Sequence, residues 1–144
     1  MSLADATKEI EEQLGGGETI QVVIKGVGDE FIFGTDRRVF VWKKGLIAGA
    51  RSLRKLATWD YRNITGVHMD TGVASGIVVI QAAGIDAGIV KYHSSNKRED
   101  AFSLPHAIPT RRVDAKQVGE GVAKLRSLIS AAQRASVTGG DSPS

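Results

Sequence analysis

The sequence predicts a mainly β domain: a bent antiparallel barrel or sandwich of seven strands, preceded by a short helix and capped by a C-terminal amphipathic helix. Two patterns predict it. Between residues 18 and 93, short segments rich in β-branched and aromatic residues alternate with turn residues, as in sandwiches and barrels. After residue 112 the apolar residues recur every three or four positions, which is typical of one helical face. A bent sheet leaves one end open, and we expect the helix to close that end.

The first element is a short helix predicted over residues 2–14, where Leu3, Ile10 and Leu14 form a narrow apolar stripe. The glycines at 15–17 end it, because glycine readily adopts the backbone conformation that closes a helix. A helix this short is marginal alone, so we expect it to dock on another element.

The predicted strands span residues 18–25, 31–33, 37–43, 56–61, 64–70, 75–83 and 87–93. In the third strand, Val39 and Val41 lie on one face and Phe40 and Trp42 on the other. This strand is therefore central and covered on both sides, or it has one face waiting for a partner. The glycine-containing segment 45–53 is predicted to be a mobile loop.

Residues 94–112 are predicted to be irregular, because they are polar and because Pro105 and Pro109 interrupt regular structure. A helix is then predicted from a cap at Asp114 to about Gln133. Its apolar face consists of Val118, Val122, Leu125, Ile129 and Ala132. The chain thus divides into a helix and glycine-rich linker (1–16), a β-rich domain (17–134) and a disordered tail (135–144).

Three segments carry a resemblance to a known family: ETIQVVIKG (18–26), FIFGTDRRVFVWKKG (31–45) and WDYRNITGV (59–67). They resemble the bacterial PH-domain-like family of the pleckstrin-homology (PH) superfold. In that family the hairpin of the second and third strands carries T-(D/N)-x-R, and a later strand ends in an aromatic residue followed by I-x-x-V. The resemblance covers roughly residues 17–133. It implies a bent sheet plugged by a C-terminal helix and a non-catalytic interaction module, and it favours oligomers without fixing their number.

Composition narrows the functional classes. The 144 residues include no cysteine, which excludes disulfides, thiolate metal sites and cysteine nucleophiles. No apolar run approaches the ~18–20 residues of a membrane span, and the first residues lack the apolar core of a signal peptide. We therefore expect a cytoplasmic protein, or one that is peripheral to the inner face of the membrane.

A basic block is the main candidate site for an anion, a lipid or a partner. It comprises Lys43, Lys44, Arg51, Arg54 and Lys55, at or beside the predicted loop. Such cations could converge on phosphates and contribute about 1 kcal/mol each near an anionic leaflet. The alternative is a solvated loop whose charges maintain solubility.

The resemblance bears on this site in two ways. PH domains that bind phosphoinositides place a lysine near the end of the first strand, and Lys25 matches it. They also place basic residues along the second strand, where this sequence has none (EFIFG). A lipid head-group pocket is therefore not supported, whereas a general anion site or a protein surface stays open.

Asp36, Arg37 and Arg38 are predicted to form a structural turn, with Asp36 accepting backbone N–H groups and one arginine pairing with an acid such as Asp60. Two tryptophans, at 42 and 59, are interpreted as core residues in preference to a peptide groove.

Nothing in the sequence supports catalysis, a cofactor or a metal. His68, His93 and His106 have no carboxylate or second histidine at ligand spacing, and neither G-x-S-x-G nor a phosphate-binding loop occurs. Nucleic acid is a weak alternative, because only 6% of residues are aromatic and the core needs most of them.

The first functional hypothesis is a non-catalytic PH-like module that acts through protein–protein contacts, with self-association. Its basis is the two-sided strand 37–43 and the acidic first helix, which could dock on the basic block of a neighbouring copy. The alternative is a peripheral module that binds anionic lipid or phosphate through the basic 43–55 loop. The sequence does not identify the partner.

Overall fold

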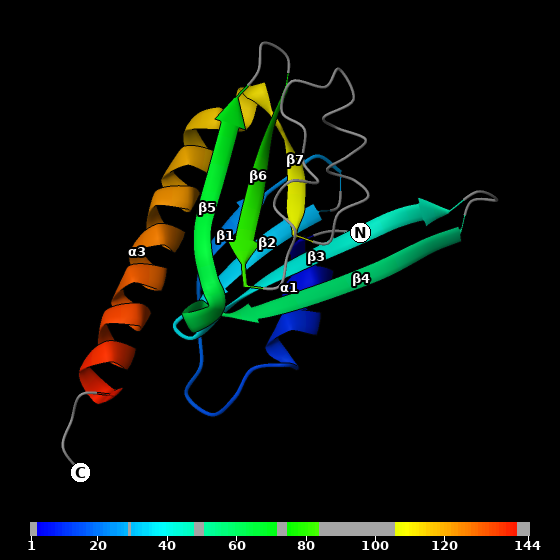
Figure 1. The fold of residues 1–144 in the computed structure, drawn as a ribbon. Helices are drawn as coiled ribbons and strands as arrows, with labels where there is room; N and C mark the ends of the chain where they lie inside the picture. Colours follow the sequence, from blue (N-terminus) through cyan, green and yellow to red (C-terminus); the bar gives the residue numbers. More distant parts are fainter. Residues whose placement is uncertain (1–2, 29, 48–50, 72–74, 84–105, 141–144) are drawn as a thin grey trace.

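Two antiparallel sheets and a long C-terminal helix build the protein (Figure 1). The structure, a computed structural model, describes residues 3–28, 30–47, 51–71, 75–83 and 106–140. The helices and strands are α1 (Leu3–Glu11), β1 (Ile20–Lys25), β2 (Glu30–Thr35), β3 (Arg38–Ile47), β4 (Arg51–Asp60), β5 (Ile64–Thr71), β6 (Ser75–Ala82), β7 (Ala107–Arg111) and α3 (Ala115–Gly140). Two 3-10 turns, η1 (Tyr61–Asn63) and η3 (Arg112–Asp114), precede β5 and α3.

The predicted fold class is confirmed. The strand order is β1-β2-β3-β4 in one sheet and β5-β6-β7 in the other. The described strands therefore form a sandwich of two antiparallel sheets and not one closed barrel. Helix α3 runs alongside β5 in Figure 1 and packs against both sheets.

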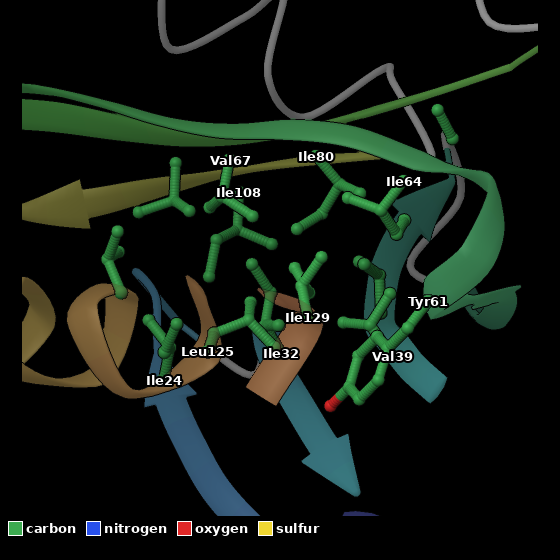
Figure 2. Packing of buried hydrophobic residues seen from close by; sticks show 14 of the residues in the cluster. Ile24, Ile32, Val39, Tyr61, Ile64, Val67, Ile80, Ile108, Leu125 and Ile129 are labelled. Atoms are coloured by element: carbon green, nitrogen blue, oxygen red, sulfur yellow. The ribbon is translucent and has the colours of Figure 1, made fainter. Parts of the chain in front are cut away.

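The main core lies between the two sheets and α3 (Figure 2). The predicted apolar face of α3 supplies four of its buried residues: Val118, Val122, Leu125 and Ile129. They meet Ile32 of β2 and Ile108 of β7, which belong to different sheets. Helix α3 therefore closes the sandwich, as the sequence predicts.

A second core lies on the opposite face of the four-stranded sheet, under α1. Ala6 and Ile10 of the helix pack on an aromatic surface made of Phe31, Phe33, Phe40 and Trp42. Strand β3 is thus covered on both sides, and the alternative of a face waiting for a partner is wrong. Of the predicted stripe of α1, Ile10 is buried, whereas Leu3 is 43% exposed because the helix presents Ala6 to the sheet instead.

The prediction of a mobile loop at residues 45–53 is wrong. Strands β3 and β4 run to Ile47 and from Arg51, with Ile47 paired to Arg51, so most of this segment is a hairpin. The segment contains glycines and small residues, which are typical of loops, and the sequence pattern therefore did not indicate a strand. Pairing with β2 ends at Lys43, so residues 44–47 and 51–54 extend past the rest of the sheet (Figure 1). We call these residues the arm.

The prediction that residues 94–112 are irregular is wrong for the last part of that range, because residues 107–111 form strand β7, which contains Pro109. The backbone N–H of Ile80 donates to the carbonyl of His106 at 2.8 Å, which makes that pair a hydrogen-bonded one. Hydrogen-bonded and non-bonded pairs alternate along an antiparallel ladder, so Pro109, opposite Ile77, occupies a non-bonded position. A proline fits an edge strand there because no ladder hydrogen bond is lost. The strand predicted at 87–93 lies outside the described residues.

Helix α3 begins directly after Asp114, as predicted, but continues to Gly140. The end predicted at Gln133 and the start of the tail at 135 are therefore wrong. The apolar stripe ends at Ala132, but helical backbone hydrogen bonds continue beyond the packed part of the helix.

Two glycines on α3 offer a test of its packing. A methyl group at Gly121 would lie 2.7 Å from Cγ1 of the buried Ile24, whereas one at Gly119 would meet only Met69, at 3.9 Å. We expect Gly119→Ala to raise the free energy of unfolding by about 0.5–1 kcal/mol, because alanine favours the helix. Gly121→Ala gains the same propensity, but we expect it to lower that free energy by about 1 kcal/mol or more through overpacking. Urea denaturation of both variants measures the difference, and equal values would contradict the close contact of α3 with β1.

Candidate functional site

The turn between β2 and β3 is built around the hydroxyl of Thr35. This oxygen accepts hydrogen bonds from the backbone N–H groups of Arg37 and Arg38, both at 3.0 Å. Asp36, which the sequence analysis placed in this role, instead accepts from the N–H of Thr19 at 3.0 Å. The turn is therefore closed by Thr35, and Asp36 ties it to the residue just before β1.

The two arginines of this turn hold the linker between α1 and β1. Arg38 donates to both carboxylate oxygens of Glu18, at 2.9 and 3.0 Å, and to the carbonyl of Gln13 at 2.6 Å. Arg37 donates to the carbonyl of Gly16 at 2.8 Å. Asp60, the partner suggested by the sequence, pairs with Arg62 at 3.2 Å instead.

Glu18 is the buried carboxylate at this junction. Burial alone would raise its pKa, but hydrogen bonds from Arg38, the N–H of Gly15 and the hydroxyl of Thr35 together lower the pKa to about 2. Glu18 is therefore ionised at neutral pH and fixes three segments of chain around one charge.

The structure does not bring the predicted basic residues together. Lys25 is exposed at the end of β1, whereas 51–55 belong to β4 at the opposite edge of the same sheet. The register places Lys43 opposite Lys55 and Lys44 opposite Arg54. Because successive positions of a strand belong to opposite faces, the backbone places these two pairs on opposite faces of the hairpin.

Lys43 is not a surface cation. Only 3% of it is exposed, and its ammonium nitrogen lies 3.5 Å from the carboxylate of Glu30, which is also buried. Burial raises the pKa of Glu30 to about 7, although the charge of Lys43 acts in the opposite direction. Burial, together with Lys43, lowers the pKa of the nearby His106. The first cation of the predicted block is thus part of a buried polar cluster where β2, β3 and the residue before β7 meet.

The sequence contained a signal for this pair. A two-residue turn at Asp36 and Arg37 sets a register in which Glu30 and Lys43 lie opposite each other, as observed. The run of basic residues nevertheless obscured the pair, and Lys43 was predicted only as one cation of the block.

Trp42 connects the sheet to α1. Its indole N–H donates to the carboxylate of Glu9 at 2.9 Å, and its ring centroid lies 6.0 Å from that of Phe31. Trp59 is half-buried and packs against the main core. Both tryptophans are therefore core residues, and the acidic first helix docks on the sheet of its own chain.

A groove separates the edge of β5 from α3, with a volume of about 360 Å³. It is lined by Ile64, Thr65, Gly66, Val67 and His68 of β5 and by Arg126, Ile129, Ser130 and Gln133 of α3. The groove was not predicted from the sequence, because its walls lie 59 residues apart at Val67 and Arg126 and neither carries a motif.

Two side chains cross this groove from the helix to the strand. The guanidinium of Arg126 donates to the carbonyl of Val67 at 2.6 and 3.1 Å. The amide of Gln133 donates to the carbonyls of Ile64 at 2.7 Å and Tyr61 at 3.1 Å. Carbonyl groups at the edge of β5 are thus satisfied by α3 instead of by another strand.

Within the described residues, no three His, Asp or Glu side chains gather as a metal site would require, and no helix is long and apolar enough to cross a membrane. His68 lies 2.8 Å from the side-chain oxygen of Gln81. His93 lies outside the described residues.

The fold has counterparts among solved structures. A pleckstrin homology domain from Shewanella amazonensis superposes with a TM-score of 0.57 at 16% sequence identity, over 87% of this chain and 88% of that one. The chain has the pleckstrin-homology fold. A DUF1696 family protein with a pleckstrin-homology domain from Shewanella loihica gives a TM-score of 0.48 at 11% identity, over 87% and 93% of the two chains. No family model and no curated protein matches the sequence.

The PH fold expected from the three resembling segments is therefore confirmed. Function on a shared fold is carried by particular sites, so the surfaces of this chain decide what it binds.

The buried pair of Lys43 and Glu30 yields a prediction on stability and pH. Because the pKa of Glu30 is higher in the folded chain than its ordinary 4.5, this residue makes stability fall as the pH rises from about 4.5 to about 7. Lys43→Met leaves the ionised Glu30 buried without its counter-charge. We expect this variant to lose about 3–5 kcal/mol of unfolding free energy at pH 8, and clearly less at pH 5, where Glu30 is protonated.

Chemical denaturation at the two pH values measures this difference. Lys25→Met is the matched control, since Lys25 is exposed and should change stability by no more than about 0.5 kcal/mol. An equal loss for Lys43→Met at pH 5 and pH 8 would show that the charge of Glu30 is not the cause.

Proposed function

We propose that the chain is a non-catalytic PH-fold module that acts through protein–protein contacts, and that it self-associates through the outer edge of β4. The observation that carries this proposal is the outer edge of β4, which runs along the sheet and into the arm. A strand whose outward backbone groups are unpaired gains from a partner strand. Among the described residues no strand pairs with the outer edge of β4.

The hydrogen-bond pattern identifies which groups the edge offers. The N–H of Tyr61 donates to the carbonyl of Arg37, so this pair is hydrogen-bonded and the pairs alternate from there along β3 and β4. Arg54, Leu56 and Thr58 therefore turn their backbone N–H and C=O groups away from β3. Such a row of unpaired groups is a template for another strand.

A second copy fits this edge. In a two-fold interface the same strand pairs with itself in antiparallel orientation. With Ala57 on the two-fold axis, Leu56 lies opposite Thr58 and Arg54 lies opposite Asp60, twice. Opposite charges in directly facing positions stabilise a strand pair. A copy centred on Lys55 would set two like charges face to face, so we propose the register centred on Ala57.

Proline at Thr58 tests this interface. Thr58→Pro removes an outward-facing N–H without taking a hydrogen bond from β3, so we expect an unchanged circular dichroism spectrum and a shift from dimer to monomer. Thr58→Val is the matched control: it also loses the hydroxyl bond to the carbonyl of Val39, but it keeps the N–H. Size exclusion with light scattering at micromolar concentration reads out the mass. A monomeric parent chain, or a Thr58→Pro variant that stays dimeric, would remove this proposal.

The second candidate is a peripheral contact with an anionic membrane at its cytoplasmic face. It is favoured by the position of Lys44, Arg51, Arg54 and Lys55 on the projecting hairpin, and it no longer includes the buried Lys43. We expect the chain to sediment with vesicles that contain phosphatidylserine, and Lys44→Glu with Arg54→Glu to abolish this. Lys8→Glu with Lys25→Glu changes the net charge equally on other elements and should retain binding. Equal sedimentation of both double variants would exclude a contact specific to the hairpin.

A further inference from the structure

We propose that the sheet face under α1 is a docking surface for an acidic amphipathic helix of another protein, and that α1 is a displaceable cover of this surface. The centre of the surface is formed by Phe31, Phe33, Phe40 and Trp42, and we call it the aromatic face. It does not include the backbone edge of β4, so the proposal does not depend on self-association. Its support comes from how α1 is packed, how it is tethered and how the two surfaces are charged.

Helix α1 covers the aromatic face with a small apolar surface. It has nine residues, fewer than the ~12–15 that an isolated helix needs, so it depends on packing to stay folded. Of these nine residues only Ala6 and Ile10 are buried, and Leu3 in the first turn is exposed. Val23, which the backbone places on the same sheet face opposite Phe33, is also exposed. A longer amphipathic helix would therefore bury apolar surface that α1 leaves open.

The linker after α1 is anchored independently of the helix. Arg38 donates to the carbonyl of Gln13 at 2.6 Å, and Arg37 donates to that of Gly16 at 2.8 Å. Both contacts lie beyond the last residue of α1, as do the hydrogen bonds of Glu18. The helix can therefore leave the sheet without breaking the network around Glu18, and it then stays tethered beside the surface that it uncovers.

The contact between Glu9 and Trp42 indicates the chemistry of the helix that this surface accepts. The carboxylate of Glu9 receives the indole N–H of Trp42 at 2.9 Å, next to the apolar anchor Ile10. A buried indole N–H needs an acceptor, and a carboxylate is a strong one. A competing helix therefore needs an acid beside its apolar anchor in order to replace this hydrogen bond.

The charges of the helix and of the sheet face are complementary. Residues 1–14 carry Asp5, Glu9, Glu11 and Glu12 against Lys8 alone. The strands place the charged residues Lys25, Arg38, Lys44, Arg54 and Asp60 on the face that α1 covers, and only the last is acidic. The surface therefore favours an acidic helix over a basic one.

Amide hydrogen exchange of the unmodified chain tests whether α1 is a displaceable cover. We expect the protection factors of residues 7–12 to be at least about a hundred-fold lower than those of β2 and β3, because α1 opens locally. This measurement needs no substitution and is independent of how any variant folds. Equal protection would overturn the proposal, because α1 would then open only when the whole domain unfolds.

Selection from a phage library of helical peptides of about 18 residues, longer than α1, tests the docking surface. The bait is the full chain with Ile10→Asp, which removes the buried anchor of α1. We expect the enriched peptides to combine an apolar stripe at helical spacing with an excess of acids. A synthetic copy of the best peptide should shift the amide resonances of β1–β4 in an NMR titration.

Two comparisons locate the contact. The synthetic peptide should bind the parent chain at least about ten-fold more weakly than the Ile10→Asp variant, because α1 occupies the surface in the parent. Leu3→Asp adds the same charge at an exposed position of α1 and should bind like the parent. Lys44→Gln in the Ile10→Asp chain removes a cation of the covered face and should weaken binding roughly three-fold, whereas Lys55→Gln belongs to the opposite face and should not.

Several outcomes would overturn the proposal. They are a library without enriched peptides, enriched peptides without acids, equal binding to the parent and to Ile10→Asp, and equal binding to the two lysine variants. A parent dimer that persists in Thr58→Pro but is lost in Ile10→Asp would also overturn it, because the occupant would then be α1 of a second copy.

Discussion

One buried charge, the carboxylate of Glu18, organises much of the rest of the structure. It stands where the three segments that resemble bacterial PH domains meet. It binds Arg38 and Thr35 of the second segment, and Tyr61 of the third donates its hydroxyl to the carbonyl of Thr35. A buried carboxylate is unfavourable unless it is paired and hydrogen-bonded, and its pKa of about 2 reflects how fully its partners compensate.

The consequences extend to both cores. The turn held by Thr35 and Arg38 sets the register of β2 against β3, and this register places Phe31 opposite Trp42 and Phe33 opposite Phe40. These pairs make the aromatic surface on which α1 rests. The same arginine holds the carbonyl of Gln13, so the linker delivers α1 to the surface that the turn has created. Helix docking and strand register are thus two results of one hydrogen-bond network.

The periodic spacing of apolar residues correctly predicted the strand and the helix whose faces are buried. The alternation in β3 and the stripe on α3 correspond to real faces, because burial on one side imposes the same period on sequence and structure. The arm and β7 were missed for a different reason. The arm has the glycine-containing composition of a loop. Strand β7 contains Pro109, which a strand accommodates only at a position without a ladder hydrogen bond, and the sequence alone does not show which positions those are. The groove was missed because Val67 and Arg126 are brought together only by the path of α3 across the sandwich.

The edges of the two sheets differ in how their backbone groups are satisfied. At β7, the carbonyl of Pro109 accepts the N–H of Val27, and helix α3 packs on β1, where Gly121 lies against Ile24. At β5, Arg126 and Gln133 occupy edge carbonyls. In the described part of the chain, neither a strand nor comparable side-chain hydrogen bonds cover the outer edge of β4.

A strand edge whose backbone groups are hydrogen-bonded to side chains differs from an unpaired edge in how readily another strand can join it. Unpaired backbone groups are indifferent to the sequence of the strand that joins them, so specificity at β4 has to come from the charges in register along it. At β5 an incoming strand would first have to displace the hydrogen bonds from Arg126 and Gln133, a cost that the edge of β4 does not impose. The side chains of α3 therefore protect β5 from non-specific strand pairing, whereas at β4 only the charges along the strand discriminate between partners.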